Sequence, residues 1–221
     1  MSRKATEVVT GEVRISYEHL LKPYAQQPNA EPKYSVTLLI PKNDIATKQR
    51  IDAAIQAAIS EGASGKWNGV RPPQPPTPIH DGDGLRPSGE AFGDECKGHW
   101  VMTASSKQPQ EIVDMGGNPI ISATEIYSGM FARVFINFFA YNSNGKKGIG
   151  AGLGPVQKTR DGEPLGGKVS ASDAFSDATQ YQPQPAPNYP PAYTQPQYQQ
   201  TVQQYQPQID PITGQPVVLP Y

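Results

Sequence analysis

Apolar and polar residues alternate most regularly between positions 130 and 141. The even positions form an unbroken apolar face with the period of a β-strand: Met130, Ala132, Val134, Ile136, Phe138 and Ala140. The odd positions are Phe131, Arg133, Phe135, Asn137, Phe139 and Tyr141. Aromatic rings beside a guanidinium can stack nucleic-acid bases and attract phosphate. A central strand buried on both faces, with Arg133 paired to an acid, has the same pattern, so the strand alone leaves both interpretations open.

The residues after this strand predict a hairpin that carries cations just beyond its tip. Positions 142–145 read Asn-Ser-Asn-Gly, residue types that tolerate the left-handed conformations of tight turns, and Lys146 and Lys147 follow. Four glycines then share one face of the next strand: Gly148, Gly150, Gly152 and Gly154. A face without side chains permits close approach of a backbone or a ligand. Neither a dinucleotide fingerprint nor a P-loop fits the glycine spacing, so no nucleotide cofactor is expected.

Shorter alternating runs predict further strands at 9–17, 33–40, 100–105, 111–114 and 120–123. In the first of them, Val9, Gly11, Val13, Ile15 and Tyr17 are assigned to the apolar face. One apolar stripe with helical period predicts a single α-helix over about 43–61. Residues 19–32 and 65–94 are rich in proline, glycine and charge, which favours long loops. The pattern predicts a mainly β fold, a small barrel like the five-stranded oligonucleotide-binding (OB) fold.

The C-terminal composition differs from that of the rest of the chain. Of the 42 residues from 180 to 221, 28 are Gln, Pro or Tyr, and the prolines would break helices and central strands. We therefore expect an OB-fold domain over 1–168 and a disordered Gln/Pro/Tyr-rich tail over 169–221.

Charge and targeting signals narrow the function classes. Residues 1–168 carry 19 basic and 17 acidic side chains, a net charge of +2, so nucleic-acid binding would depend on a local patch and on stacking. A single cysteine, Cys96, excludes an intramolecular disulfide. The first residues lack the apolar run of a signal peptide, and no stretch has membrane-spanning length. We expect a cytoplasmic protein without membrane association.

Two clusters of possible metal ligands occur in the sequence. In both, the pattern favours a structural role for the residues over a metal site. Asp81, Asp83, Asp94 and Glu95 could hold a divalent cation, but Leu85 stands where a calcium loop needs its third oxygen ligand, which favours a turn. Cys96 and His99 have a spacing that zinc sites use, but no second pair of ligands accompanies them. No nucleophile elbow is present either. The sequence therefore predicts no catalytic residue, no metal and no cofactor.

Nine short motifs, in order along the chain, carry a resemblance to a known family. They are KYSV at 33–36, LIPK at 39–42, DGD at 81–83, GHW at 98–100, SSK at 105–107, IYSG at 126–129, GAGL at 150–153, VQK at 156–158 and DGEPLGG at 161–167. With these motifs the chain resembles bacteriophage single-stranded DNA-binding proteins of replication and recombination. The resemblance implies an OB fold, DNA coating without sequence preference and a homodimer. Such proteins often end in an acidic tail that recruits replication enzymes, whereas this tail is Gln, Pro and Tyr.

We therefore predict a non-enzymatic protein that binds single-stranded DNA, with phage or host replication or recombination proteins as further partners of the tail. The rings expected to stack bases are Trp100, Phe135, Phe139 and Tyr141. The cations expected to neutralise phosphates are Lys107, Arg133, Lys146 and Lys147. The alternative is a structural or scaffold protein of a phage, in which the aromatic face is core or subunit interface.

Overall fold

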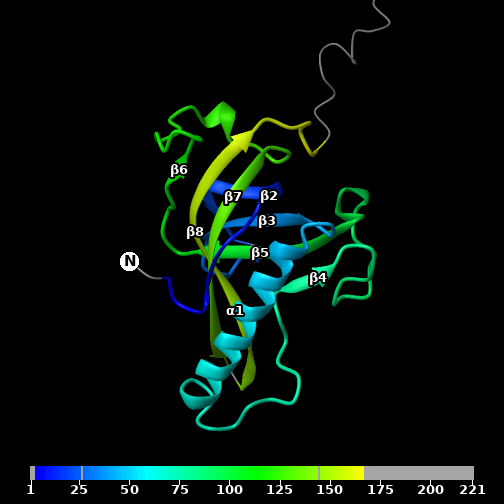
Figure 1. Ribbon diagram of the computed structural model, residues 1–221, viewed down its shortest axis with the longest axis vertical. Coiled ribbons are helices and arrows are strands. Elements are labelled where there is room, and N and C mark those ends of the chain that lie inside the picture. The colour runs from blue at the N-terminus through cyan, green and yellow to red at the C-terminus, as the bar shows by residue number, and fades with distance from the viewer. Residues whose placement is uncertain (1–2, 26, 144, 167–221) are drawn as a thin grey trace, which may run out of the picture. The chain divides into compact units, whose positions relative to one another are not determined.

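The computed structural model describes residues 3–25, 27–143 and 145–166. Over these residues the protein is mainly β with one α-helix, α1 (Ile45–Ser64) (Figure 1). The strands are β1 (Glu7–Val9), β2 (Val13–Tyr24), β3 (Lys33–Pro41), β4 (Ile79–Asp81), β5 (His99–Ser106), β6 (Ile112–Val113), β7 (Phe131–Ser143) and β8 (Lys146–Arg160). Two short 3-10 helices, η1 (Asp94–Cys96) and η2 (Ala123–Glu125), complete the described elements.

Five of the strands form a ring. Antiparallel pairs join β7 to β2, β2 to β3 and β3 to β5, and β8 pairs with β7 along most of its length. The ring is completed between β5 and β8, which run parallel and meet through Ser105 and Gly152. This small ring of five strands confirms the prediction of a mainly β, OB-like fold with one helix.

The predicted core face is confirmed at the even positions from 130 to 138, whereas Ala140 is only partly buried. Met130, Ala132, Val134, Ile136 and Phe138 are all buried, and the apolar stripe of α1 packs against β7. The predicted helix, about 43–61, matches α1 closely. Asp44 caps its first turn by accepting a hydrogen bond from the Thr47 amide at 3.0 Å, which fixes where the helix begins.

Residues 65–94, which were predicted as a long loop, contain more structure than their composition indicates. Trp67 is only 1 % exposed and packs beside Gly62 at the end of α1. Farther on, residues 79–81 form β4, which pairs with β5. A high content of proline and glycine predicts an irregular chain. It does not predict that a single large ring such as Trp67 is buried, because that depends on the surrounding tertiary structure.

The first predicted strand, 9–17, is wrong in two respects. The chain turns between β1 and β2, and β2 continues to Tyr24 through residues predicted as loop. Within β2, Tyr17 and Glu18 stand opposite the single residue Val36 of β3, which is a β-bulge. The bulge leaves Tyr17 60 % exposed, so its assignment to the apolar face is incorrect. The predicted strand at 120–123 is also absent, and the segment leads into η2.

The predicted tail, 169–221, lies outside the described residues, so the domain boundary stays a prediction. In the described part of the chain, no helix combines the length and the apolar character needed to cross a membrane.

Candidate nucleic-acid interface

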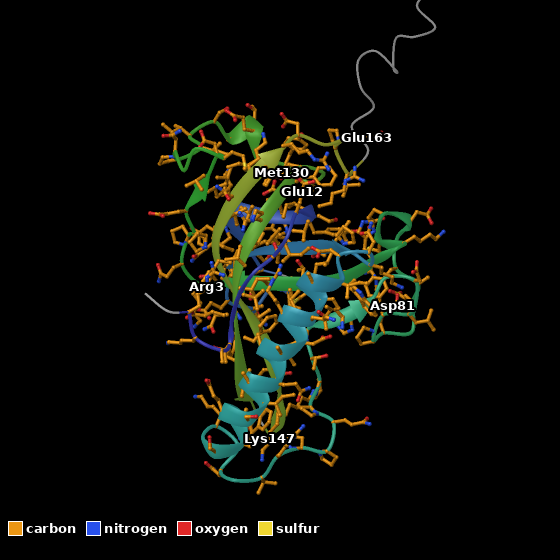
Figure 2. The ribbon with its side chains drawn as sticks, in the orientation of Figure 1. Arg3, Glu12, Asp81, Met130, Lys147 and Glu163 are labelled. Carbon is orange, nitrogen blue, oxygen red and sulfur yellow. The ribbon has the colours of Figure 1, made fainter. Side chains whose placement is uncertain are left out.

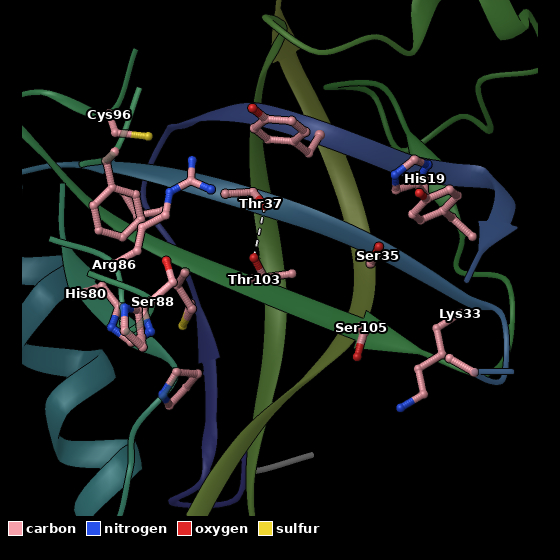
Figure 3. A pocket seen from close by; sticks show the side chains of 18 of the residues that line it. His19, Lys33, Ser35, Thr37, His80, Arg86, Ser88, Cys96, Thr103 and Ser105 are labelled. Atoms are coloured by element: carbon pink, nitrogen blue, oxygen red, sulfur yellow. Dashed lines mark hydrogen bonds between the residues drawn. The ribbon is translucent and has the colours of Figure 1, made fainter. Parts of the chain in front are cut away.

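A groove of about 850 Å³ runs over the outer face of β3 and β5, the second and third strands of the ring (Figure 3). Its floor consists of small hydroxyl side chains, Ser35 and Thr37 from β3 and Thr103 and Ser105 from β5. Thr37 and Thr103 lie opposite each other, and their hydroxyl oxygens are 2.9 Å apart. The same face of the OB fold, with its neighbouring loops, is the surface that commonly binds oligonucleotides.

Aromatic side chains from β2 form one wall of this groove. Tyr17 reaches it through the bulge. His19 and Tyr24 also line it, and their rings stack at 4.5 Å between centroids with an interplanar angle of 13°. Lys33, at the start of β3, adds an exposed cation at the same end. Rings and a cation along a hydroxyl floor suit a polymer of bases and phosphates.

The opposite wall comes from the segment between β4 and η1. Phe92 lines the groove and packs on an apolar cluster of the outer sheet face, made of Leu39, Cys96, Val101 and Leu165. Burial is the main reason why the pKa of the Cys96 thiol is raised. Leu165 lies in the segment that follows β8, so two parts of the chain far apart in sequence hold this wall in place.

Arg86 also lies in this wall, and its guanidinium carbon is 5.2 Å from the centre of the Phe92 ring. Figure 3 shows the guanidinium pointing over β3 toward Thr37. The Nε atom is buried and has no hydrogen-bond acceptor within the described residues. Arg86 thus brings a cation to the groove with one donor unused.

A clasp of one lysine and two aspartates fixes the start of this segment. The Lys42 ammonium lies 2.6 Å from an Asp83 oxygen and also binds Asp81. Asp83 also accepts a hydrogen bond from the Gly98 amide at 2.9 Å. The hydrogen bonds from Lys42 are the main cause of the lowered pKa values of both carboxyls. Gly82 is required between them, because a Cβ there would lie 2.1 Å from the Cys96 carbonyl oxygen.

The two aspartates therefore serve as partners of a lysine. Across the described residues, His, Cys, Asp and Glu side chains form no group of three that could hold a metal.

The predicted aromatic residues of β7 lie on the outer face of the β7–β8 hairpin. Each ring covers a glycine of β8, with Tyr141 over Gly148 and Phe139 over Gly150. A Cβ at Gly150 would lie 2.7 Å from the Phe139 ring. Phe135 covers Gly154 in the same way. The glycine face therefore accommodates rings of the partner strand. Phe139 remains 47 % exposed.

The predicted cations of the hairpin have different surroundings. Arg133 is exposed on β7 opposite Gln157, and Lys146 is exposed beside the turn. Lys147 is half-buried, and its ammonium donates to the carbonyl oxygens of Trp67 and Val70, both at 3.2 Å (Figure 2). Lys147, predicted to neutralise phosphates, therefore already binds two backbone carbonyls.

Trp100 and Lys107 lie apart from the hairpin face. Trp100 is half-buried and packs against the core, and the ammonium groups of Lys48 and Lys42 lie 4.6 and 5.1 Å from its ring centre. Lys107 follows β5 and forms an ion pair at 2.7 Å with Glu31, which lines the groove. Of the eight predicted site residues, six thus lie on the β7–β8 hairpin, and Trp100 and Lys107 lie at two other places.

The groove and the hairpin face belong to one continuous outer surface. Ser35 lies opposite Ser105, Ser105 meets Gly152 of β8, and Gly152 lies opposite Asn137 of β7. This row crosses four strands and consists of small or amide side chains. The rings of Phe139 and Phe135, which cover Gly150 and Gly154, flank this row on the hairpin.

Sequence reasoning missed the groove residues Tyr17, His19, Tyr24, Arg86 and Phe92. A usable signal was the run of hydroxyl residues at the outward positions of two predicted strands, 33–40 and 100–105. Small side chains there leave room above a sheet, but the walls of the groove depend on the bulge in β2 and on the segment after β4.

The protein is mainly β, with a ring of five strands, one helix and a groove over two of the strands. Residues 6–184 match the family model described as "Enterobacter phage Enc34, ssDNA-binding protein", and the chain belongs to this family. The predicted resemblance to phage single-stranded DNA-binding proteins is thereby confirmed.

Three solved or curated proteins illustrate the similarity. The single-stranded DNA-binding protein from bacteriophage Enc34, in complex with ssDNA, is 33 % identical with a TM-score of 0.64, over 74 % of this chain and 91 % of that chain. Protein p50 of Acyrthosiphon pisum secondary endosymbiont phage 1 is 28 % identical over 172 residues, 75 % of this chain and 90 % of the relative. The bacteriophage T7 single-stranded DNA-binding protein gp2.5 is 17 % identical with a TM-score of 0.50, over 83 % of this chain and 97 % of that chain, and it shows similarity of fold alone.

Proposed function

We propose that this protein binds and protects single-stranded DNA, without sequence preference, during phage DNA replication and recombination. The observation that carries the proposal is the groove over β3 and β5, with stacking rings on β2 and cations at both walls. Membership in a family of phage single-stranded DNA-binding proteins supports it.

Stacking accounts for binding by a domain with so little net charge. Each base stacked on an aromatic ring contributes about 1–3 kcal/mol, and every base has a face that can stack. Three rings in the groove therefore contribute more than a net charge of +2 distributed over the domain. Lys33, Arg86 and Lys107 would meet the phosphates along the groove. Because these contacts release the counterions of the nucleic acid, binding should weaken as salt rises.

The outer face of the hairpin extends the proposed site. Phe139 is exposed enough to stack a base, and Arg133 and Lys146 stand on the same hairpin. Phe135 and Tyr141 are half-buried and expose less of their rings. Trp100 and Lys147 are the weakest members of the predicted set, because lysines already cover the Trp100 ring and Lys147 already binds carbonyls.

The wider setting follows from the same proposal. The protein acts by binding rather than by catalysis, as a homodimer in the cytoplasm of the bacterial host. Its tail would recruit phage or host replication and recombination proteins. A scaffold role remains the alternative, and DNA binding separates the two.

A labelled oligothymidylate titrated with the full chain in low and high salt tests the proposal. We expect tight binding in low salt that weakens as salt rises, and much weaker binding of a duplex of equal length. Absence of single-strand binding at both salt concentrations would contradict the proposal and favour a scaffold role.

A further inference from the structure

Two unfavourable features of the described structure occur at one place in the groove, beside Thr37. Tyr17 has a φ of 44°, in the left-handed region that bulky residues rarely adopt. Its neighbour Ser16 pairs with Thr37, so the Tyr17 ring stands beside that threonine on the groove surface. Strained backbone of this kind persists where the surrounding structure fixes it, and it is concentrated at functional sites.

The second feature is the unused donor of Arg86. A guanidinium stays charged at any ordinary pH, and burial of an unpaired donor on it is costly. No ion pair within the described residues includes Arg86, and its guanidinium points toward Thr37 (Figure 3). The buried Nε is closed to a ligand, so the terminal nitrogens of the guanidinium, which form no ion pair within the described residues, are the atoms that a phosphate oxygen would meet. A phosphate provides the charge and geometry that a guanidinium prefers.

We infer that Tyr17 and Arg86 form the two walls of one nucleotide subsite, with the Thr37–Thr103 hydroxyl pair as its floor. In this subsite the Tyr17 ring stacks on the base, and Arg86, supported by Phe92, binds the neighbouring phosphate. The subsite rests on the proposed single-strand binding and identifies where its most ordered contact lies. The strain at Tyr17 and the unpaired Nε of Arg86 lower the stability of the free protein, and both side chains already line the groove without a ligand.

This arrangement makes an unusual prediction, because stability and binding should respond in opposite directions. Asn adopts the left-handed conformation more readily than Tyr, so Tyr17→Asn should raise Tm by about 2–4 °C. The same change should weaken oligothymidylate binding by about 5- to 150-fold. Tyr17→Phe keeps the ring and the strain, and is the control that should retain both wild-type values.

Arg86→Met keeps an unbranched aliphatic side chain and removes the charge and the unused donor, together with the guanidinium contact to Phe92. We expect a Tm equal to or above that of the wild type, weaker oligonucleotide binding, and a slope of log affinity against log salt smaller by about 0.7. Lys66→Met removes an exposed cation after α1, away from the groove, and should leave the slope unchanged. Because both groups serve one subsite, the double variant Tyr17→Asn with Arg86→Met should lose less affinity than the product of the single losses.

The outcomes are distinguishable. Binding by the wild type together with unchanged affinity in Tyr17→Asn or Arg86→Met overturns the subsite and leaves the proposed function standing. A marked fall of Tm in both variants also overturns it, since the two residues would then be structural. A wild-type chain that binds no oligothymidylate overturns the subsite and the proposed function together.

Discussion

The indole Nε1 of Trp67 donates a hydrogen bond to the carbonyl oxygen of Tyr141 at 2.8 Å. This contact fastens the segment after α1 to the end of β7, where the hairpin extends beyond the ring of strands (Figure 1). Lys147 binds the same segment through the Trp67 and Val70 carbonyls. The hairpin that carries the proposed stacking residues is thus held from one side by these three hydrogen bonds.

Trp67→Phe should lower the free energy of unfolding by about 1–3 kcal/mol, because it leaves the Tyr141 carbonyl without its donor. Urea denaturation measures the change. Trp100→Phe is the matched control, since the Trp100 ring is half-buried and its contacts with Lys42 and Lys48 contribute about 1 kcal/mol or less. A larger loss in the Trp100 variant than in the Trp67 variant would contradict this account.

Phe139→Ala should weaken oligonucleotide binding by about 5- to 150-fold and change stability by little more than 1 kcal/mol, because the ring is 47 % exposed. Fluorescence anisotropy and thermal melting measure the two effects. Phe138→Ala, at the adjacent buried position, should instead cost about 3–5 kcal/mol of stability. If Phe139→Ala unfolds the protein, the ring is structural and the hairpin face does not take part as proposed.

Lys146→Ala and Lys147→Ala form a matched pair of neighbouring substitutions. Lys146 is exposed, so its removal should reduce the slope of log affinity against log salt by about 0.7 and leave stability unchanged. Removal of Lys147 should lower stability by about 1 kcal/mol, because two backbone carbonyls lose a charged donor, although the Trp67 carbonyl keeps the Val70 amide. Equal effects of the two changes on both measurements would show that the two lysines have the same role.

The clasp of Lys42 with Asp81 and Asp83 predicts a loss of stability in acid. The pKa values of both aspartates are lowered by Lys42, so their stabilisation is present above the unfolded pKa of about 3.9 and is lost as pH falls through the lowered values. The pKa of Lys42 is raised by the same hydrogen bonds, so its share is lost only at high pH, above about 10.4.

Thermal melting between pH 7 and pH 2.5 tests the clasp. The wild type should lose more Tm over this range than the double variant Asp81→Asn with Asp83→Asn, which has no carboxylates there to protonate. Lys48 and Asp52 form a comparable exposed pair within α1, so Asp52→Asn serves as the control for a general charge effect. Identical pH profiles for the wild type and the clasp variant would refute the assignment.

The sequence by itself determined the elements whose burial pattern repeats locally. The even face of β7 and the stripe of α1 follow from residues two, three and four positions apart, which the backbone geometry of a strand or a helix places on one side. The ordered motifs also identified the family, since they extend along most of the domain.

Only the tertiary structure decided which outward side chains meet. Tyr17 belongs to the apolar face in a regular strand, and one extra residue in β2 turns it into the groove. Arg86 lies far from Tyr17 in sequence and comes to Thr37 because β4 pairs with β5 and the Lys42 clasp fixes the segment that follows. The groove depends on strand register and on long-range contacts, which the local alternation of apolar and polar residues does not encode.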